Sequence, residues 1–344
     1  MSRGAKVIVA GAGALGLSVA LELARAGCAV TVCDPEGAGR ASAVAAGMLA
    51  PVFEAALDVE AADHLDLLLA ARDLWPELAA RTGVVLDRSG AAAVGSEAWL
   101  AKVRGRLAGL GVRGADLPRA MLEALAPGVA PGLEAVLVRE DWRLDPRPSL
   151  AALRGAAHAA GVAFRAEAVT ARSDADWLVA ATGAGQGLAP LAPELARLTP
   201  IKGQILRFAG VRSGPLSLRG EGCYAVAGAD GLAVGATMEP GLDDAVVDTV
   251  ALGPLVEAAG RLFPGLRPAS HEASAGVRAA TPDGLPLVGR SRTPGVILAA
   301  GARRNGWLLA PLVARLVTAC VMGRDAGSYA TRLDPGRFER GRAA

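Results

Sequence analysis

The stretch that decides the fold is Lys6–Asp34, which reads KVIVAGAGALGLSVALELARAGCAVTVCD. Lys6–Ala10 is a short apolar run typical of a buried strand, and Gly11 ends it. Ala14–Arg25 has the spacing of apolar residues expected of a helix, and Ala29–Cys33 is a second apolar run. The stretch therefore predicts a strand–helix–strand unit within about 30 residues.

The turn between the first strand and the helix has the pattern G-x-G-x-x-G. Gly11 allows a tight turn, Gly13 lets the backbone approach a pyrophosphate, and Gly16 lets helix and strand pack closely. The start of the helix offers free N–H groups and the positive end of its dipole to phosphates. Asp34 ends the second strand, where its carboxylate can bind ribose hydroxyls. We expect a dinucleotide here, and this segment alone leaves NAD and FAD both open.

Length and charge bound the remaining possibilities. The chain has 344 residues, which is enough for about two domains. Its 36 basic and 34 acidic residues nearly cancel, which argues against nucleic-acid binding through bulk charge. The sequence contains no uncharged apolar run of the length of a transmembrane helix. We therefore expect neither a nucleic-acid partner nor a membrane partner.

Cysteines and histidines are few and scattered. None of the four cysteines forms a C-x-x-C pair, which favours free thiols in a reducing compartment and predicts a cytoplasmic protein. The three histidines are far apart and show no spacing typical of metal ligands. We expect no metal site.

Further elements follow from periodicity and turn residues. The pattern predicts a long helix over Ala61–Thr82, a hairpin of Val84–Asp87 with Ala91–Val94, and an antiparallel sheet from Gln204 to Ala236. Additional helices and strands are expected at Pro146–Ala160, Val162–Phe164, Trp177–Ala181, Val296–Ala300 and Trp307–Met322. Elements typical of a parallel sheet with helices occur at the start, middle and end of the chain, and segments typical of an antiparallel sheet lie between them. This interleaving predicts two domains, each discontinuous in sequence.

Five blocks of sequence resemble a known family. They are Arg40–Pro51 (RASAVAAGMLAP), Leu144–Arg147 (LDPR), Gly235–Glu239 (GATME), Gly276–Pro286 (GVRAATPDGLP) and Gly301–Pro311 (GARRNGWLLAP). Together they are similar, in the expected order, to the glycine oxidase branch of the FAD-dependent D-amino-acid oxidase superfamily. The resemblance implies an α/β fold with a Rossmann-like FAD-binding domain interleaved with an antiparallel-sheet substrate domain. We expect the FAD-binding domain at 1–82, 145–203 and 276–344, and the substrate-binding domain at 83–144 and 204–275.

The resemblance also implies that the dinucleotide is FAD, held without a covalent bond. By position, Ala14 and Leu15 would meet the pyrophosphate, and Asp34 the ribose. The other implied FAD contacts are Ala41, Ser42, Ala46, Gly47, Met48, Val169, Thr182, Gly183, Ala302, Arg303, Arg304, Asn305, Gly306, Trp307 and Leu308. Val169 would belong to a strand whose backbone faces the adenine. The helix that begins near Trp307 would point its positive end at the flavin edge where negative charge gathers on reduction.

Four residues are implied at the substrate. Arg278 would anchor the carboxylate, because a guanidinium matches two carboxylate oxygens with a planar fork and stays charged. Tyr224 would place a phenol beside that carboxylate, Met238 would form an apolar wall, and Arg304 would be a second arginine near the pocket mouth. The sequence departs from its relatives at Ala302 and Arg303, which replace the family's His-Tyr, and at Ala279, which replaces a proline.

The predicted function is oxidation of a small amino acid or amine, glycine first, to the imine with O2 reduced to hydrogen peroxide. By resemblance, this reaction would serve thiamine biosynthesis, and a homo-oligomer would be consistent with the family. Three alternatives stay open. They are a D-amino-acid or sarcosine-type dehydrogenase with another electron acceptor, a flavin-binding protein without oxidase turnover, and an NAD-dependent dehydrogenase.

Overall fold

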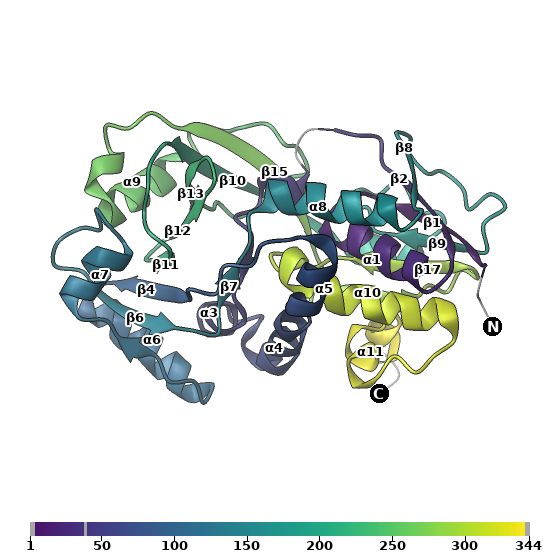
Figure 1. The fold of residues 1–344 in the computed structure, drawn as a ribbon, viewed down its shortest axis with the longest axis horizontal. Coiled ribbons are helices and arrows are strands. Elements are labelled where there is room, and N and C mark those ends of the chain that lie inside the picture. The colour runs from purple at the N-terminus through teal and green to yellow at the C-terminus, as the bar shows by residue number, and fades with distance from the viewer. Residues whose placement is uncertain (1–3, 38–39, 341–344) are drawn as a thin grey trace.

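The structure is a computed structural model that describes residues 4–37 and 40–340. Its mixed α/β architecture is built on a six-stranded and a nine-stranded sheet, as the sequence predicts for the fold class. Figure 1 shows the six-stranded sheet and its helices at one end of the molecule, with both termini, and the nine-stranded sheet at the other. The long strands β10 (Thr199–Ala209) and β15 (Glu272–Ala280) run between the two regions.

The six-stranded sheet has the order β16-β17-β9-β1-β2-β8. Only β16 is antiparallel to its neighbour among these strands. Its strands are β1 (Lys6–Ala10), β2 (Ala29–Cys33), β8 (Ala163–Arg165), β9 (Trp177–Ala180), β16 (Leu287–Arg290) and β17 (Val296–Ala300). Because β1 and β2 flank α1 (Ala14–Arg25) and pair in parallel, the predicted strand–helix–strand unit is confirmed.

Helices of this region pack against one another and share an apolar core with the six-stranded sheet. α1 packs against both α8 (Pro146–Ala159) and α10 (Gly306–Met322), as Figure 1 shows. The shared core is apolar and includes Leu17 and Val19 of α1 together with Val313 of α10, which are at most 2% exposed. Burying such side chains contributes about 1.5–3 kcal/mol each. This packing fixes the N-termini of α1 and α10 relative to each other.

The nine-stranded sheet has the order β14-β10-β13-β12-β11-β4-β6-β5, and β15 also pairs with β10. Its remaining strands are β4 (Ala91–Gly95), β5 (Ala115–Asp116), β6 (Glu134–Val138), β11 (Ser217–Gly220), β12 (Cys223–Gly228), β13 (Gly231–Gly235) and β14 (Glu239–Pro240). The strands β10 to β13 pair antiparallel, which confirms the sheet predicted from Gln204 to Ala236.

Smaller elements complete the described chain. A two-stranded sheet joins β3 (Met48–Leu49) to β7 (Trp142–Arg143). The remaining helices are α2 (Ala41–Val44), α3 (Pro51–Leu57), η1 (Ala62–His64), α4 (Leu65–Asp73), α5 (Trp75–Thr82), α6 (Glu97–Gly109), α7 (Arg119–Leu125), η2 (Pro193–Arg197), α9 (Gly253–Leu262), η3 (Pro264–Leu266), α11 (Ser328–Leu333) and α12 (Arg337–Arg340). Among the described residues, none of these helices has the length and hydropathy needed to span a bilayer.

Two predicted elements are wrong in detail. The long helix over Ala61–Thr82 is broken into η1, α4 and α5, with α5 beginning just before Pro76, whose missing N–H and ring interrupt a helix. The hairpin of Val84–Asp87 with Ala91–Val94 does not form. Asp87 instead forms an isolated bridge with Arg143, and β4 pairs with β6 and β11. Local alternation could not reveal these partners, because they come from distant parts of the chain.

The predicted domain boundaries stay a prediction. The segments of the two sheets alternate along the chain, as a pair of discontinuous domains requires. β10 crosses the predicted boundary at 203/204, however, and β15 crosses the one at 275/276. These two strands, paired along their length, join the regions on which the sites described next are built.

Candidate active site

The turn between β1 and α1 leaves no room for side chains at two of its glycines. A Cβ at Gly11 would lie 2.3 Å from the carbonyl oxygen of Ala181, and Gly11 has φ +111°. A Cβ at Gly16 would lie 2.0 Å from the carbonyl oxygen of Gly11. The backbone of this turn is therefore packed against the end of β9, which is the close approach that a pyrophosphate-binding turn needs.

The start of α1 offers backbone donors to a phosphate. Its N-cap is Gly13, which has no side chain of its own to cap the helix. The Ala14 amide donates to Ser42 Oγ at 3.0 Å, while the Leu15 and Gly16 amides belong to the first turn, whose N–H groups have no partner within a helix. These donors and the helix dipole fit the pyrophosphate of a dinucleotide.

Asp34 is the residue predicted to bind a ribose, and its carboxylate is already engaged. Its Oδ2 accepts from the Ala12 amide at 2.7 Å, and its Oδ1 accepts from the Glu36 amide at 2.9 Å and from the Arg40 guanidinium. The Arg40 contact was not predicted from the sequence. A ribose hydroxyl that binds Asp34 must share the carboxylate with Arg40 or displace it.

A cavity of about 350 Å³ lies where the face of the nine-stranded sheet meets α2, α3 and the start of α10. The structure brings ten of the predicted site residues to its lining, namely Ala41, Ala46, Gly47, Met48, Tyr224, Met238, Arg278, Arg304, Asn305 and Trp307. They come from five separate parts of the chain. The residues implied at the isoalloxazine and those implied at the substrate therefore share one cavity.

Two glycines in the floor of this cavity leave space for large side chains from neighbouring strands. A Cβ at Gly203 of β10 would lie 2.2–2.4 Å from the guanidinium of Arg278, which projects from the neighbouring strand β15. A Cβ at Gly235 of β13 would lie 2.3 Å from the phenol oxygen of Tyr224 on β12. The Arg278 and Tyr224 side chains thus lie across the sheet, each over a glycine of an adjacent strand.

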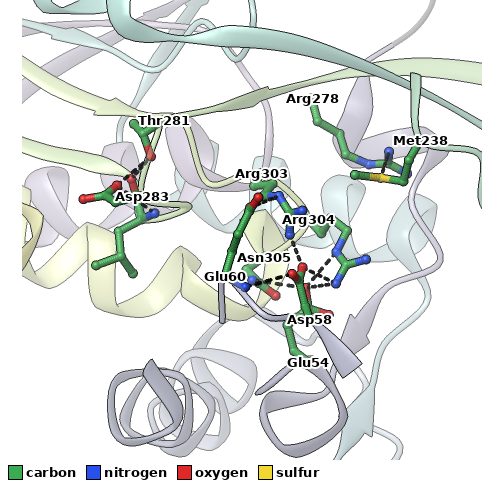
Figure 2. Close-up of polar contacts among 11 residues, drawn as sticks. Glu54, Asp58, Glu60, Met238, Arg278, Thr281, Asp283, Arg303, Arg304 and Asn305 are labelled. Carbon is green, nitrogen blue, oxygen red and sulfur yellow. Dashed lines mark hydrogen bonds and ion pairs between the residues drawn. The ribbon is translucent and has the colours of Figure 1, made fainter. Parts of the chain in front are cut away.

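Arg278 is held without a carboxylate partner among the described residues. Its Nη1 contacts the carbonyl oxygen of Thr237 at 3.4 Å. The same nitrogen contacts Met238 Sδ at 3.3 Å (Figure 2). Burial lowers the pKa of this guanidinium, but arginine keeps its charge at working pH. A partly buried cation with only weak acceptors is stabilised when an anion joins it, so the guanidinium of Arg278 has the chemistry to bind a carboxylate.

Tyr224 supplies a neutral hydroxyl to the same place. Burial raises the pKa of the phenol, and the charges of Arg278 and Arg219 oppose that shift without reversing it. The ring also faces Arg219, whose Cζ lies 6.0 Å from the ring centroid. At neutral pH Tyr224 can therefore donate a hydrogen bond to an anion bound at Arg278.

Arg304 is paired, unlike Arg278. Its guanidinium donates to Glu54 at 2.8 Å and also contacts Asp58 (Figure 2). Burial alone would lower the pKa of Arg304, but the negative charges of Glu54 and Asp58 raise it. Arg303 binds Asp58 and Glu60, so the two consecutive arginines are neutralised by α3 and the segment after it.

Sequence reasoning missed Glu54, Arg219 and Asp141. Glu54 and Arg219 line the cavity, and Asp141 is completely buried and accepts from the Val52 and Phe53 amides at 2.8 and 3.0 Å. Burial raises the pKa of Asp141 to about 7. No motif marks Arg219 or Asp141. Glu54 stands three residues after Pro51, where a helix start was a readable signal.

The N-terminus of α10 opens on the cavity. Asn305 is its N-cap, without a side-chain cap, and both Asn305 and Trp307 line the cavity. Trp307 Nε1 donates to the carbonyl oxygen of Ser42 at 3.0 Å, which ties α10 to the segment that also meets Ala14. Ala302 and Leu308 are buried beside this helix start, and Gly306 is its first residue. This geometry fits a flavin whose reduced form gains negative charge near the positive end of the helix.

The remaining predicted contacts lie outside the cavity lining. Thr182 and Gly183 follow β9, next to the Gly11 turn, and Thr182 Oγ1 donates to the carbonyl oxygen of Gly185 at 2.9 Å. Val169 lies in a segment without regular structure after β8, not in a strand as expected, and packs with the apolar cluster beneath the sheet. Among the described residues, no group of three or more His, Cys, Asp or Glu could hold a metal ion.

Comparison with known proteins identifies one family. The family model for FAD dependent oxidoreductases (DAO) matches residues 6–320. The bifunctional protein ThiO/ThiG of Trichormus variabilis is 31% identical over 97% of this chain, which spans about half (55%) of that protein's length. Glycine oxidase of Pseudomonas aeruginosa is 29% identical over 93% of this chain and 95% of its own. The crystal structure of glycine oxidase from Geobacillus kaustophilus superposes with a TM-score of 0.82 at 27% identity, covering 97% of this chain and 99% of that one.

Proposed function

The chain belongs to the family of FAD dependent oxidoreductases, and from that premise we propose that it oxidises a small amino acid or amine, with glycine favoured. The product is the imine, which water converts to the oxo acid and ammonia, while O2 accepts the two electrons and becomes hydrogen peroxide. Relatives that are named glycine oxidase support this choice of substrate. The observation that carries it is the partly buried Arg278 guanidinium, which faces the cavity without a carboxylate partner among the described residues.

FAD would be held by four features of this chain. The donors at the start of α1 and the Asp34 carboxylate would bind the pyrophosphate and the ribose. Ala46, Gly47 and Met48 would lie along the isoalloxazine, and the α10 N-terminus would face the edge that gains negative charge. When bound, FAD supplies the two-electron acceptor for the Cα–H bond of the substrate.

The chain's own residues would bind and orient the amine. Arg278 would bind the carboxylate with two parallel hydrogen bonds, and the Tyr224 hydroxyl would donate a third. Met238 would form an apolar wall beside the guanidinium, which its sulfur already contacts. Orientation by such a clamp lowers the barrier by holding the reacting carbon next to its acceptor. Glu54, whose carboxylate lines the same cavity, is engaged by Arg304, so we assign it a positioning role toward Arg304.

We propose that FAD is bound without a covalent bond. Cys223 is the cysteine that lines the cavity among the described residues, and burial raises its pKa to about 11, so it is not a ready nucleophile. Acid precipitation of the purified yellow protein should therefore leave the flavin in the supernatant. Flavin that stays with the precipitate would contradict this proposal.

The test of the proposed function is an amine panel read by flavin absorbance and peroxide together. Glycine, sarcosine and D-alanine are added anaerobically, and the loss of the oxidised flavin's absorbance band is recorded. Air is then admitted, and peroxide is measured. We expect bleaching with glycine and stoichiometric peroxide. Bleaching without peroxide would favour a dehydrogenase with another acceptor, no bleaching with any amine a flavin protein without turnover, and a colourless preparation an NAD enzyme.

The setting of the reaction is also a proposal. The names of the ThiO relatives support a role in thiamine biosynthesis. Cys33, Cys223 and Cys320 are free thiols, which supports a reducing, cytoplasmic location. Growth of a thiamine-requiring strain that lacks its glycine-oxidising enzyme, with and without this gene, tests the first. Sedimentation of the purified protein tests whether it forms a homo-oligomer.

A further inference from the structure

Arg219 is the one of the cavity's three lining arginines to which the proposed function gives no role. It projects from β11 beside Tyr224, with which it is in register, and its side chain is only 11% exposed. It lines the same cavity as Arg278. Desolvating a guanidinium is unfavourable unless its donors are satisfied, so the state of those donors matters.

The donors of Arg219 are poorly satisfied. Its Nε is buried and has no hydrogen-bond partner among the described residues. Its nearest acidic oxygen is Glu54 Oε2, at 3.8 Å from Nη2, which is longer than a hydrogen bond. Glu54 meanwhile gives its other oxygen, Oε1, to Arg304 at 2.8 Å. Glu54 therefore partly neutralises the charge of Arg219 without accepting a hydrogen bond from the Arg219 guanidinium.

The two incompletely bonded guanidiniums flank Tyr224. Arg278 lies over Gly203 of β10, and the Tyr224 phenol lies over Gly235 of β13, the next strand. Arg219 lies on the other side of the tyrosine, with its Cζ 6.0 Å from the ring centroid. A carboxylate bound by Arg278 and the Tyr224 hydroxyl would leave the fork of Arg219 free for a second anion in the same cavity.

We propose that this chain binds amines with two carboxylates, the first on Arg278 and the second on Arg219. This inference rests on the proposed function and narrows its substrate class from simple amino acids to amino dicarboxylic acids. Arg219 is then a specificity residue that contacts the substrate away from the reacting carbon. Because arginine binds a carboxylate through a planar two-point contact, the second carboxylate strengthens binding and fixes the orientation of the amine.

Equilibrium binding tests the proposal without turnover. The FAD-loaded protein is titrated by calorimetry with three pairs of acids that carry no amine: malonate with propionate, succinate with butyrate, and glutarate with pentanoate. We expect at least one dicarboxylate to bind fivefold or more tightly than its monocarboxylate partner. An advantage below fivefold in all three pairs would overturn the proposal.

Variants identify the residue responsible. Arg219→Met should reduce the advantage of the dicarboxylate to below twofold and leave the Kd of the monocarboxylate within threefold. Arg219→Lys, which keeps the charge and serves as a second variant if Arg219→Met does not fold, should retain part of the advantage. Arg113→Met, at an exposed arginine between α6 and β5, is the matched control and should change neither Kd. An unchanged advantage in a folded Arg219→Met or Arg219→Lys protein would contradict the assignment.

Turnover then separates this inference from the function on which it rests. D-Aspartate and D-2-aminobutyrate have the same carbon chain and differ in the terminal carboxylate. We expect a KM for D-aspartate at least fivefold lower than that for D-2-aminobutyrate in the wild type, with the difference lost in Arg219→Met. If no amine bleaches the flavin, the proposed function fails while the calorimetry still decides the role of Arg219. If D-2-aminobutyrate has the lower KM, the dicarboxylate inference fails while the oxidase survives.

Discussion

The proposed nucleotide cradle, which is the Gly11–Gly16 turn with the start of α1, and the proposed substrate cavity are built in opposite ways. The cradle comes from one continuous stretch, in which Gly11, Gly16 and the start of α1 are neighbours in sequence as well as in space. The cavity is assembled from α3, β11, β12, β15 and α10, which are separated by up to about 250 residues. The cradle therefore depends on backbone geometry, whereas the cavity depends on how charges from distant segments are paired.

That difference separates two arginines of the cavity that look equivalent in sequence. Arg304 meets Glu54 and Asp58 and is neutralised, whereas Arg278 meets a carbonyl oxygen and a sulfur. The unpaired arginine is the one suited to bind an external carboxylate. Each of the following predictions tests one side of this comparison.

The largest effect is expected in the cradle. Gly11→Ala adds a Cβ that would lie 2.3 Å from the Ala181 carbonyl oxygen, at a φ that alanine rarely adopts. We expect the purified variant to lose its flavin absorbance and its activity altogether. Gly83→Ala is the matched control, because Gly83 also has positive φ but open space around it. It should keep its flavin and lose about 1 kcal/mol of stability. A yellow, active Gly11→Ala protein would show that the turn does not need its glycine.

The next effect is expected at the unpaired arginine. Truncating one partner of a buried charge pair loses about 2–5 kcal/mol, so Arg278→Ala should lower kcat/KM for glycine by about 30- to 4000-fold. Flavin content should be unchanged, since the cradle is separate. Steady-state peroxide assays measure the first quantity and the absorbance ratio of flavin to protein the second. A loss below fivefold in a protein with full flavin content would rule out the anchoring role.

A smaller effect is expected from the phenol. Tyr224→Phe removes one hydrogen bond to the carboxylate, which contributes about 0.5–1.5 kcal/mol, so KM should rise by about 2- to 12-fold. The ring that covers Gly235 remains, so the fold should not change. Tyr329→Phe removes the other tyrosine hydroxyl of the chain, which contacts the carbonyl oxygen of Asp66, and serves as control. Equal KM values in the two variants would remove Tyr224 from the substrate site.

The smallest expected effect is a dependence of the protein's stability on pH. Burial raises the pKa of Asp141 from its ordinary value near 4 to about 7. The folded state then holds this proton more tightly than the unfolded state does. The contribution to stability is therefore fully present below pH 4 (roughly) and is lost as the pH rises through about 7.

Thermal unfolding at pH 5 and pH 8 (about one to two units either side of that pKa) measures this slope. The Tm of the wild type should be lower at pH 8 than at pH 5. The corresponding decrease in Tm for Asp141→Asn should be smaller. The variant should also be less stable at both values, because its amide cannot accept from both the Val52 and Phe53 amides as well as a carboxyl does. Parallel curves for the two proteins would assign the slope to other groups.

The sequence was most informative where the structure is local. Gly11, Gly13 and Gly16 act through the backbone of their own turn, so their spacing carries the information. Pro76 was a readable stop signal, yet the apolar periodicity across it predicted one helix where the structure has two. The partners of β4 could not be read, because pairing with β6 and β11 depends on segments far along the chain.

The substrate cavity was predictable only in part, for the same reason. Arg278 and Tyr224 were identified through family resemblance, not through any pattern of charge. Arg219 carries no local signal, and Pro51 marks only a helix start near Glu54; the importance of both residues follows from which side chains the fold brings within 4 Å of one another. Whether an arginine is paired is a property of the folded chain, and this is the property that distinguishes Arg278 from Arg304.

The central claim is that Arg278 binds the carboxylate of the substrate, and comparing glycine with methylamine tests it most directly. The two amines differ by that carboxylate alone, so the rates of anaerobic flavin reduction are measured for both in the wild type and in Arg278→Ala. The account predicts that the wild type prefers glycine by about 100-fold or more and that the preference in the variant falls below about tenfold. A preference for glycine that survives unchanged in the variant would contradict it.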